Sequence, residues 1–158
     1  MLLVSGLVSA NLVLAKEKQD VITLQWQDLI PFEERNTIPP QREIINHDGE
    51  APAQLLFGGV RDDLNNKLIT IPGFVIPLEG DNEKITEFLL VPFFGACIHV
   101  PPPPPNQIIY VKFEHGAPIQ QLWDVVNVTG VMKTQTTQSE LAQTGYLLEG
   151  VSVAPFQE

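Results

Sequence analysis

Five consecutive prolines, at positions 101–105, limit what this chain can fold into more than any other feature. A proline has no backbone N–H to donate, so such a run excludes both the interior of a helix and a central strand of a sheet. It favours an extended polyproline II rod of about 3.1 Å per residue. We expect this rod to lie along a surface or an edge, as a rigid connection between strands.

The chain after residue 66 has the pattern of short strands separated by turns. Segments rich in branched and aromatic residues follow one another, with proline, glycine or asparagine between them. The predicted strands are residues 68–79, 85–93, 107–113, 122–133 and 144–156. The polar segment 136–143 is expected to form one helical turn at most, and residues 114–121 to form a short connection without a helix.

Glycines inside these strands predict that the sheet curves. Gly73, Gly130 and Gly150 each stand within a β-rich run, where glycine marks a bulge or a tight bend. A sheet that bends in this way closes most simply into a small barrel. We therefore predict an all-β fold over residues 67–156, a small five-stranded OB-like curved sheet or barrel, with a β-sandwich as the alternative.

The N-terminal residues are expected to stand outside this barrel. Residues 1–15 are uncharged and dominated by Leu and Val, and the chain turns polar at Lys16, as after a secretory signal peptide. A retained anchor is the alternative, but a stable membrane span needs about 20 apolar residues, so we expect none after processing. Residues 16–66 are broken by prolines and glycines, which predicts an irregular N-terminal wrap with a short strand around Trp26.

The length and the net charge of the chain limit which classes of function it can have. The chain has 158 residues, 44% of them hydrophobic, which suits one domain with a modest core. Its formal net charge of −10 repels nucleic acid phosphates and anionic membrane surfaces. We therefore expect no nucleic acid partner.

Cys97 is the single cysteine of the chain. In an oxidising compartment it cannot form an internal disulfide, so it packs inertly, pairs between chains, reacts, or binds a metal. The neighbouring Phe93 and Phe94 are expected to pack in the core or at its rim.

Cys97 and His99 form the candidate metal site. On an extended backbone, two residues that are two positions apart point to the same face, so both side chains could share one ligand. Thiolate and imidazole are preferred zinc ligands and also suit copper, so the pair supplies half of a tetrahedral site. The candidates for the remaining ligands are Glu87, His115, His47 and Glu114, none of which has a diagnostic spacing.

Four stretches together resemble the bacterial family DUF3299. They are IPGFVIPLE, EFLLVPFFGACIHVPPPPPNQIIYV, LWDVVNVTGVMK and YLLEGVSV, and the resemblance covers about residues 24–154. It implies a small exported protein of a Gram-negative bacterium, located in the periplasm, with no established activity. The resemblance also implies metal handling, since some family members are encoded beside ABC-transporter components and occur in zinc-responsive gene sets.

Two functions remain open from the sequence. The first is an exported accessory protein that binds or delivers a metal ion, zinc first, together with a membrane transporter. The second is a non-metal periplasmic protein-interaction module with a structural cysteine. An enzyme with a thiol nucleophile would need a third polar group to orient His99, and the sequence identifies none. An apolar environment around Cys97 would favour the second function, whereas convergence of Cys97 and His99 with a third ligand would favour the first.

Overall fold

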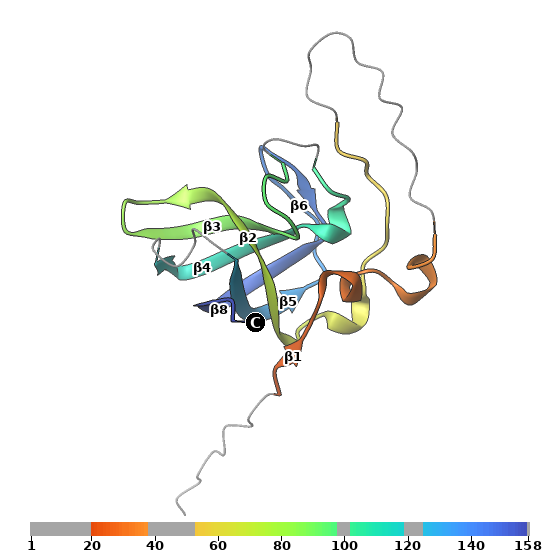
Figure 1. The fold of residues 1–158 in the computed structure, drawn as a ribbon, viewed down its shortest axis with the longest axis horizontal. Helices are drawn as coiled ribbons and strands as arrows, with labels where there is room; N and C mark the ends of the chain where they lie inside the picture. The colour runs from red at the N-terminus through yellow and green to blue at the C-terminus, as the bar shows by residue number, and fades with distance from the viewer. Residues whose placement is uncertain (1–19, 38–52, 98–101, 119–124, 158) are drawn as a thin grey trace, which may run out of the picture.

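The computed structural model describes residues 20–37, 53–97, 102–118 and 125–157, and its long strands close into a barrel (Figure 1). The barrel strands are β2 (Leu68–Gly80), β3 (Lys84–Val91), β4 (Ile109–Pro118), β5 (Val126–Lys133) and β8 (Tyr146–Pro155). They follow the order β2-β3-β4-β8-β5, and β5 pairs again with β2. The sheet therefore closes on itself.

The strand directions identify the type of barrel. Neighbouring barrel strands are antiparallel, except that β4 and β8 are parallel. The third barrel strand thus lies beside the fifth, and the fourth returns to the first, which is the connectivity of an OB-fold. The predicted OB-like barrel is confirmed.

The three predicted glycine bends fall where the ladders change. Strand β2 pairs with β5 as far as Gly73 and with β3 from Phe74 onward, so it changes partner at the glycine. Gly130 lies opposite Gly150, beside a one-residue register shift between β5 and β8. A Cβ at Gly150 would lie 2.3 Å from the Phe113 ring, so this position has no room for a side chain.

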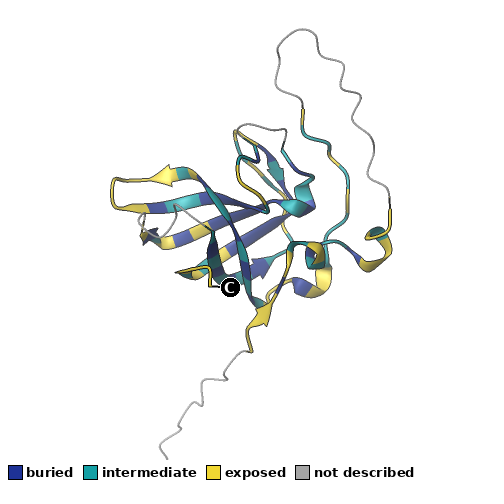
Figure 2. Cartoon of the chain, viewed as in Figure 1, coloured by how far each residue is buried: buried dark blue, intermediate teal, exposed yellow. Residues whose placement is uncertain are grey.

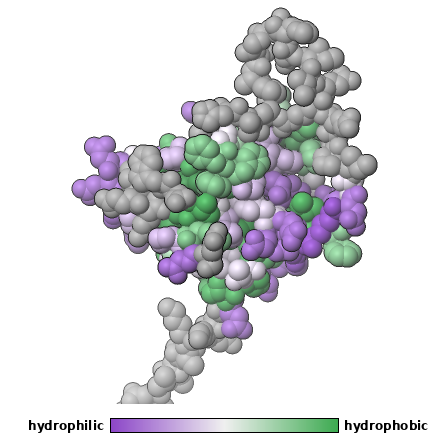
Figure 3. All heavy atoms as spheres, in the orientation of Figure 1, coloured by the Kyte–Doolittle hydropathy of each residue, from purple (hydrophilic) through white to green (hydrophobic). Residues whose placement is uncertain are grey.

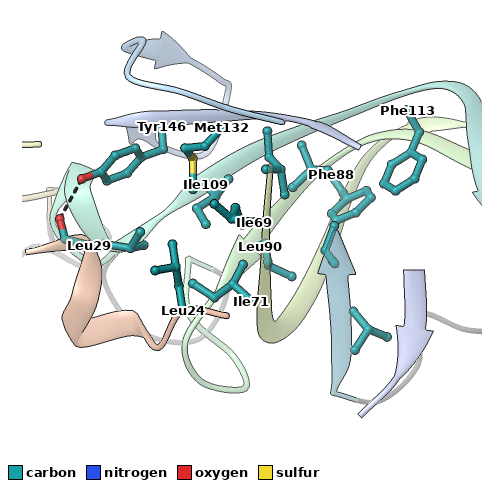
Figure 4. Close-up of a cluster of buried hydrophobic side chains, with 14 of the residues drawn as sticks. Leu24, Leu29, Ile69, Ile71, Phe88, Leu90, Ile109, Phe113, Met132 and Tyr146 are labelled. Carbon is teal, nitrogen blue, oxygen red and sulfur yellow. Dashed lines mark hydrogen bonds between the residues drawn. The ribbon is translucent and has the colours of Figure 1, made fainter. Parts of the chain in front are cut away.

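The barrel interior holds the main hydrophobic core. Buried and less buried residues alternate along β5, whereas residues 88–91 of β3 are buried on both faces (Figure 2). Inside the barrel the rings of Phe88 and Phe113 stack at 5.9 Å between centroids (Figure 4). Leu89 and Val91, on the opposite face of β3 from Phe88, belong to a second cluster. We call this second set the outer cluster; its buried members are Ile76, Leu89, Val91, Ala96, Ile108, Tyr110, Ala142 and Leu147.

The N-terminal residues form short elements against the barrel. Strand β1 (Ile22–Thr23) pairs in parallel with β2, and the 3-10 helices are η1 (Trp26–Leu29), η2 (Phe32–Glu34) and η3 (Asp62–Leu64). The expected strand around Trp26 is wrong: residue 26 begins a 3-10 turn, and its indole N–H donates to the Pro72 carbonyl at 2.7 Å. Within the described ranges, no helix is long and apolar enough to cross a membrane.

Two segments between the predicted strands form strand pairs that the sequence did not predict. Segment 136–143 enters a hairpin of β6 (Thr137–Gln138) and β7 (Gln143–Thr144), closed by the Ser139 N–H donating to the Ala142 carbonyl at 3.0 Å. No helical turn forms there. Residues 114–118 continue β4 past a bulge and pair again with β3, so they are strand and not connection.

Replacement of Val128 by Asp tests the barrel interior. Val128 is fully buried between β2 and β8, so the carboxylate would have no partner and the free energy of unfolding should fall by about 4 kcal/mol or more. The matched Val151→Asp change, at a side chain that is 65% exposed, should cost about 0.5 kcal/mol or less. Urea unfolding measures both, and equal losses would contradict the described core.

Candidate functional site

The loop after β3 turns the chain back over the outer face of the barrel. Gly95 has φ +80° and Cys97 has φ +64°, both in the left-handed region. A non-glycine residue in this region is uncommon and costs on the order of 1 kcal/mol, and such strain often accompanies functional sites. Ala96 is buried in the outer cluster, and Cys97 packs half-buried against the same cluster.

A side chain helps to hold the proline segment beyond this loop, in addition to the Gly145 N–H, which donates to the Pro105 carbonyl at 2.6 Å. The Gln54 amide donates to the carbonyls of Pro103 and Gln143, both at 2.8 Å, and its oxygen accepts the Gln143 N–H at 2.8 Å. Because the described prolines offer only carbonyls, an amide that donates is the kind of group that can fix them. Gln54 thus ties the N-terminal wrap, the proline segment and β7 together.

The segment re-enters the barrel through η4 (Pro105–Gln107). The buried Asn106 side chain donates to the Gly59 carbonyl at 2.9 Å, and the Gln107 side chain donates to the Trp26 carbonyl at 3.1 Å. Each end of the described proline segment is therefore fixed to the N-terminal wrap.

Cys97 does not have the geometry assumed for a shared Cys97–His99 site. It lies in a turn with left-handed backbone, so the alternation of an extended strand does not apply at this residue. His99 and His47 lie outside the described residues.

The other predicted ligands lie in two further environments. Glu87 accepts a hydrogen bond from the Tyr110 hydroxyl and pairs with the Lys112 ammonium at 3.0 Å, and these donors hold the pKa of its carboxyl below the usual value. Exposed Glu114 and His115 line a cleft between β4 and β8, of which Cys97 is not a part. Among the described residues, no group of three or more His, Cys, Asp or Glu could hold a metal ion.

The protonation state of Cys97 follows from its burial. Desolvation against the outer cluster raises the pKa of the thiol to about 11. At neutral pH the sulfur is therefore a protonated thiol, which is a poor nucleophile. Any metal bound there would have to displace this proton.

The sequence prediction missed an exposed aromatic pair in the same loop. Phe93 is 45% exposed and Phe94 is 79% exposed, and the Phe94 ring makes an edge contact with Phe74 at 6.1 Å between centroids. We call Phe93 and Phe94 the aromatic tip. Of the two expected positions, core or rim, Phe94 takes the rim: it lies outside the outer cluster and touches it through Phe74. The sequence signal that could have predicted this exposed pair is two adjacent phenylalanines just before Gly95.

Comparison with known proteins gives one family. The DUF3299 family, described as a protein of unknown function, matches residues 26–155. The crystal structure of a DUF3299 family protein from Pseudomonas aeruginosa PAO1 superposes with a TM-score of 0.73 at 37% identity, covering 88% of this chain and 98% of that chain. No curated protein matches.

The pH dependence of Cys97 alkylation tests the buried thiol. With a pKa of about 11, the thiolate fraction and the iodoacetamide rate should still rise about tenfold per pH unit between pH 8 and 10. In urea-unfolded protein the rate should level off near the ordinary pKa of 9.0. A plateau at or below pH 9 in the folded protein would contradict the described packing.

Proposed function

Because the chain belongs to the DUF3299 family, whose description assigns no function, we propose from its geometry that it is an exported protein-interaction module of the Gram-negative periplasm. It binds a partner protein through the aromatic tip, and Cys97 has a structural role beneath that surface. We propose a membrane transporter component as the partner.

One observation carries this proposal: the aromatic tip is exposed while the residues that follow it are packed. Phe94 is 79% exposed, yet Ala96 is fully buried and Cys97 packs on the outer cluster. Burying a phenylalanine side chain contributes about 1.5–3 kcal/mol, so an exposed ring on a fixed base is a strong potential contact for a partner. Aromatic residues are enriched at protein interfaces. Single exposed apolar residues, in contrast, are common on protein surfaces and do not by themselves indicate an interface.

The base under the tip is held in place before any partner binds. Phe74 supports the Phe94 ring from β2, and Gln54 fixes the proline segment that follows the loop. A surface ordered in advance loses less conformational entropy on association. Figure 3 shows hydrophobic residues exposed in the middle of one face of the molecule, while the tip of the β2–β3 hairpin, at the left, is hydrophilic.

Site-specific photo-cross-linking tests the interaction module. A benzophenone amino acid in place of Phe94 should give one discrete cross-linked product in living cells, which mass spectrometry then identifies. The matched control is Phe32, which is 80% exposed but lies in the N-terminal wrap with the Arg35 guanidinium 5.8 Å from its ring centroid. No product at position 94, or the same products at both positions, would contradict the proposal.

Zinc binding or delivery is a second candidate, favoured by the left-handed backbone at Cys97. Strain of this kind persists where the surroundings enforce it and is frequent at ligand sites, and the thiol is only half-buried. His99 is the proposed second ligand. The raised pKa of Cys97 opposes this function, because the free energy of zinc binding must also cover removal of the thiol proton.

Chelator competition at several pH values tests the zinc candidate. Since the pKa of Cys97 is about 11, one thiol proton should be displaced throughout the neutral range, and the affinity should fall about tenfold per unit as the pH drops from 9 to 7. Below about pH 6.5, protonation of the imidazole should steepen the loss. Equal affinities for the wild type and the Cys97→Ser, His99→Ala double variant would exclude this site.

A further inference from the structure

The barrel is closed, but the seam between its two parallel strands, β4 and β8, is paired over only part of its length. Pairing of β4 with β8 runs from Ile109–Tyr146 to Lys112–Glu149 and stops there within the described residues. Beyond that point β4 rejoins β3 through Ala117 and Pro118, while β8 stays with β5. A cleft of about 490 Å³ lies between the separating strands, lined by residues 113–118 and 150–153. We call it the seam cleft.

The walls of the seam cleft are strand edges. Gly150, Ser152 and Val153 of β8 pair with β5, Val151 lies at the bulge between them, and among the described residues no strand pairs with the other edge of this segment, which lines the cleft. On the opposite wall, residues 113–118 of β4 have no ladder partner in β8 among the described residues. A strand edge presents a row of backbone N–H and C=O groups, which is a template for another extended chain.

We propose that the seam cleft binds an extended peptide segment of another protein, which adds as a strand to the free edge of β8 at residues 150–153. Because β4 and β8 run in the same direction, one inserted strand can be antiparallel to both walls, and antiparallel pairing is the slightly more stable mode. The four residues of this edge span about 13 Å at roughly 3.3 Å per residue, so the recognised segment is short.

The side chains around the cleft indicate the composition of that segment. Val151 is 65% exposed at the β-bulge, and Phe113 and Val153 line the inner part, so alternate residues of the segment should be apolar. Glu114 lies on the rim, and the whole chain carries a net charge of −10, so the outward residues should be Lys or Arg. A second copy of this chain would bring another ten negative charges, which disfavours self-association at this edge.

Titration of the full chain with a synthetic peptide tests the proposal. The probe is an acetylated, amidated hexapeptide that alternates lysine and valine, and its twin carries N-methyl groups on alternate amides. The NMR signals of residues 150–153 should shift with the first peptide, and their amide hydrogen exchange should slow. The twin should bind at least tenfold more weakly, because strand addition depends on backbone hydrogen bonds.

Matched variants locate the binding surface. Val151→Lys places a like charge in the cleft and should weaken the lysine–valine peptide about tenfold. Leu56→Lys is the control, since Leu56 is also 65% exposed but does not line the cleft. Loss of the aromatic tip by Phe94→Ser should leave peptide affinity unchanged, which separates this proposal from the proposed function. Equal affinities for Val151→Lys and Leu56→Lys, or for the peptide and its N-methylated twin, would overturn it.

Discussion

Closure of the barrel depends on the change of partner by β2 at Gly73. One strand can lie beside both β5 and β3 only if it bends between them, and Gly73 is the residue where the pairing changes. A Cβ at this glycine would lie 2.8 Å from the Leu90 side chain and 3.0 Å from the Trp26 ring. The Leu90 side chain of the core and the Trp26 ring of the N-terminal wrap thus fill the space that a side chain at residue 73 would need. The Trp26 indole N–H also donates a hydrogen bond to the adjacent Pro72 carbonyl. The interior cluster exists because this bend brings β5 back to β2.

Neutral side chains attach the wrap to the barrel where backbone pairing cannot. The buried Tyr146 hydroxyl donates to the Leu29 carbonyl at 2.7 Å (Figure 4). It also accepts the Arg61 backbone N–H at 2.7 Å. Burial raises the pKa of Tyr146 to about 12, so this hydroxyl stays protonated and keeps its donor. Gln54 and Asn106 serve the proline segment in the same way. Side chains that both donate and accept replace a strand ladder in a part of the chain rich in prolines.

The sequence predicts the barrel better than the candidate site. The strands follow from local sequence patterns, whereas the site depends on packing between residues that are far apart in the chain. Strand patterns and the bend glycines are local signals, and they predict the bounds of β2 to within one residue and the end of β5 at Lys133, although β5 begins only at Val126. The return of β4 to β3 at Ala117, and the β6–β7 hairpin, depend on partners that local composition does not reveal. Cys97 shows the same limit for the site. Its spacing from His99 is visible in the sequence, but its left-handed backbone and raised pKa arise from packing on the outer cluster.

The arrangement of the chain around its barrel decides which surfaces remain for partners. OB-folds commonly bind ligands on the face formed by their second and third strands, which here are β3 and β4. On that face the outer cluster is built by the protein itself, with Ala96 and Ala142 contributed from outside those strands. A face used to pack the chain's own loops has less area left for a ligand. The aromatic tip, at the edge of this packing, and the seam beside the parallel strand pair are two surfaces that stay exposed. Both follow from one topology: the loop after β3 covers the face, and the parallel strands pair over only part of their length.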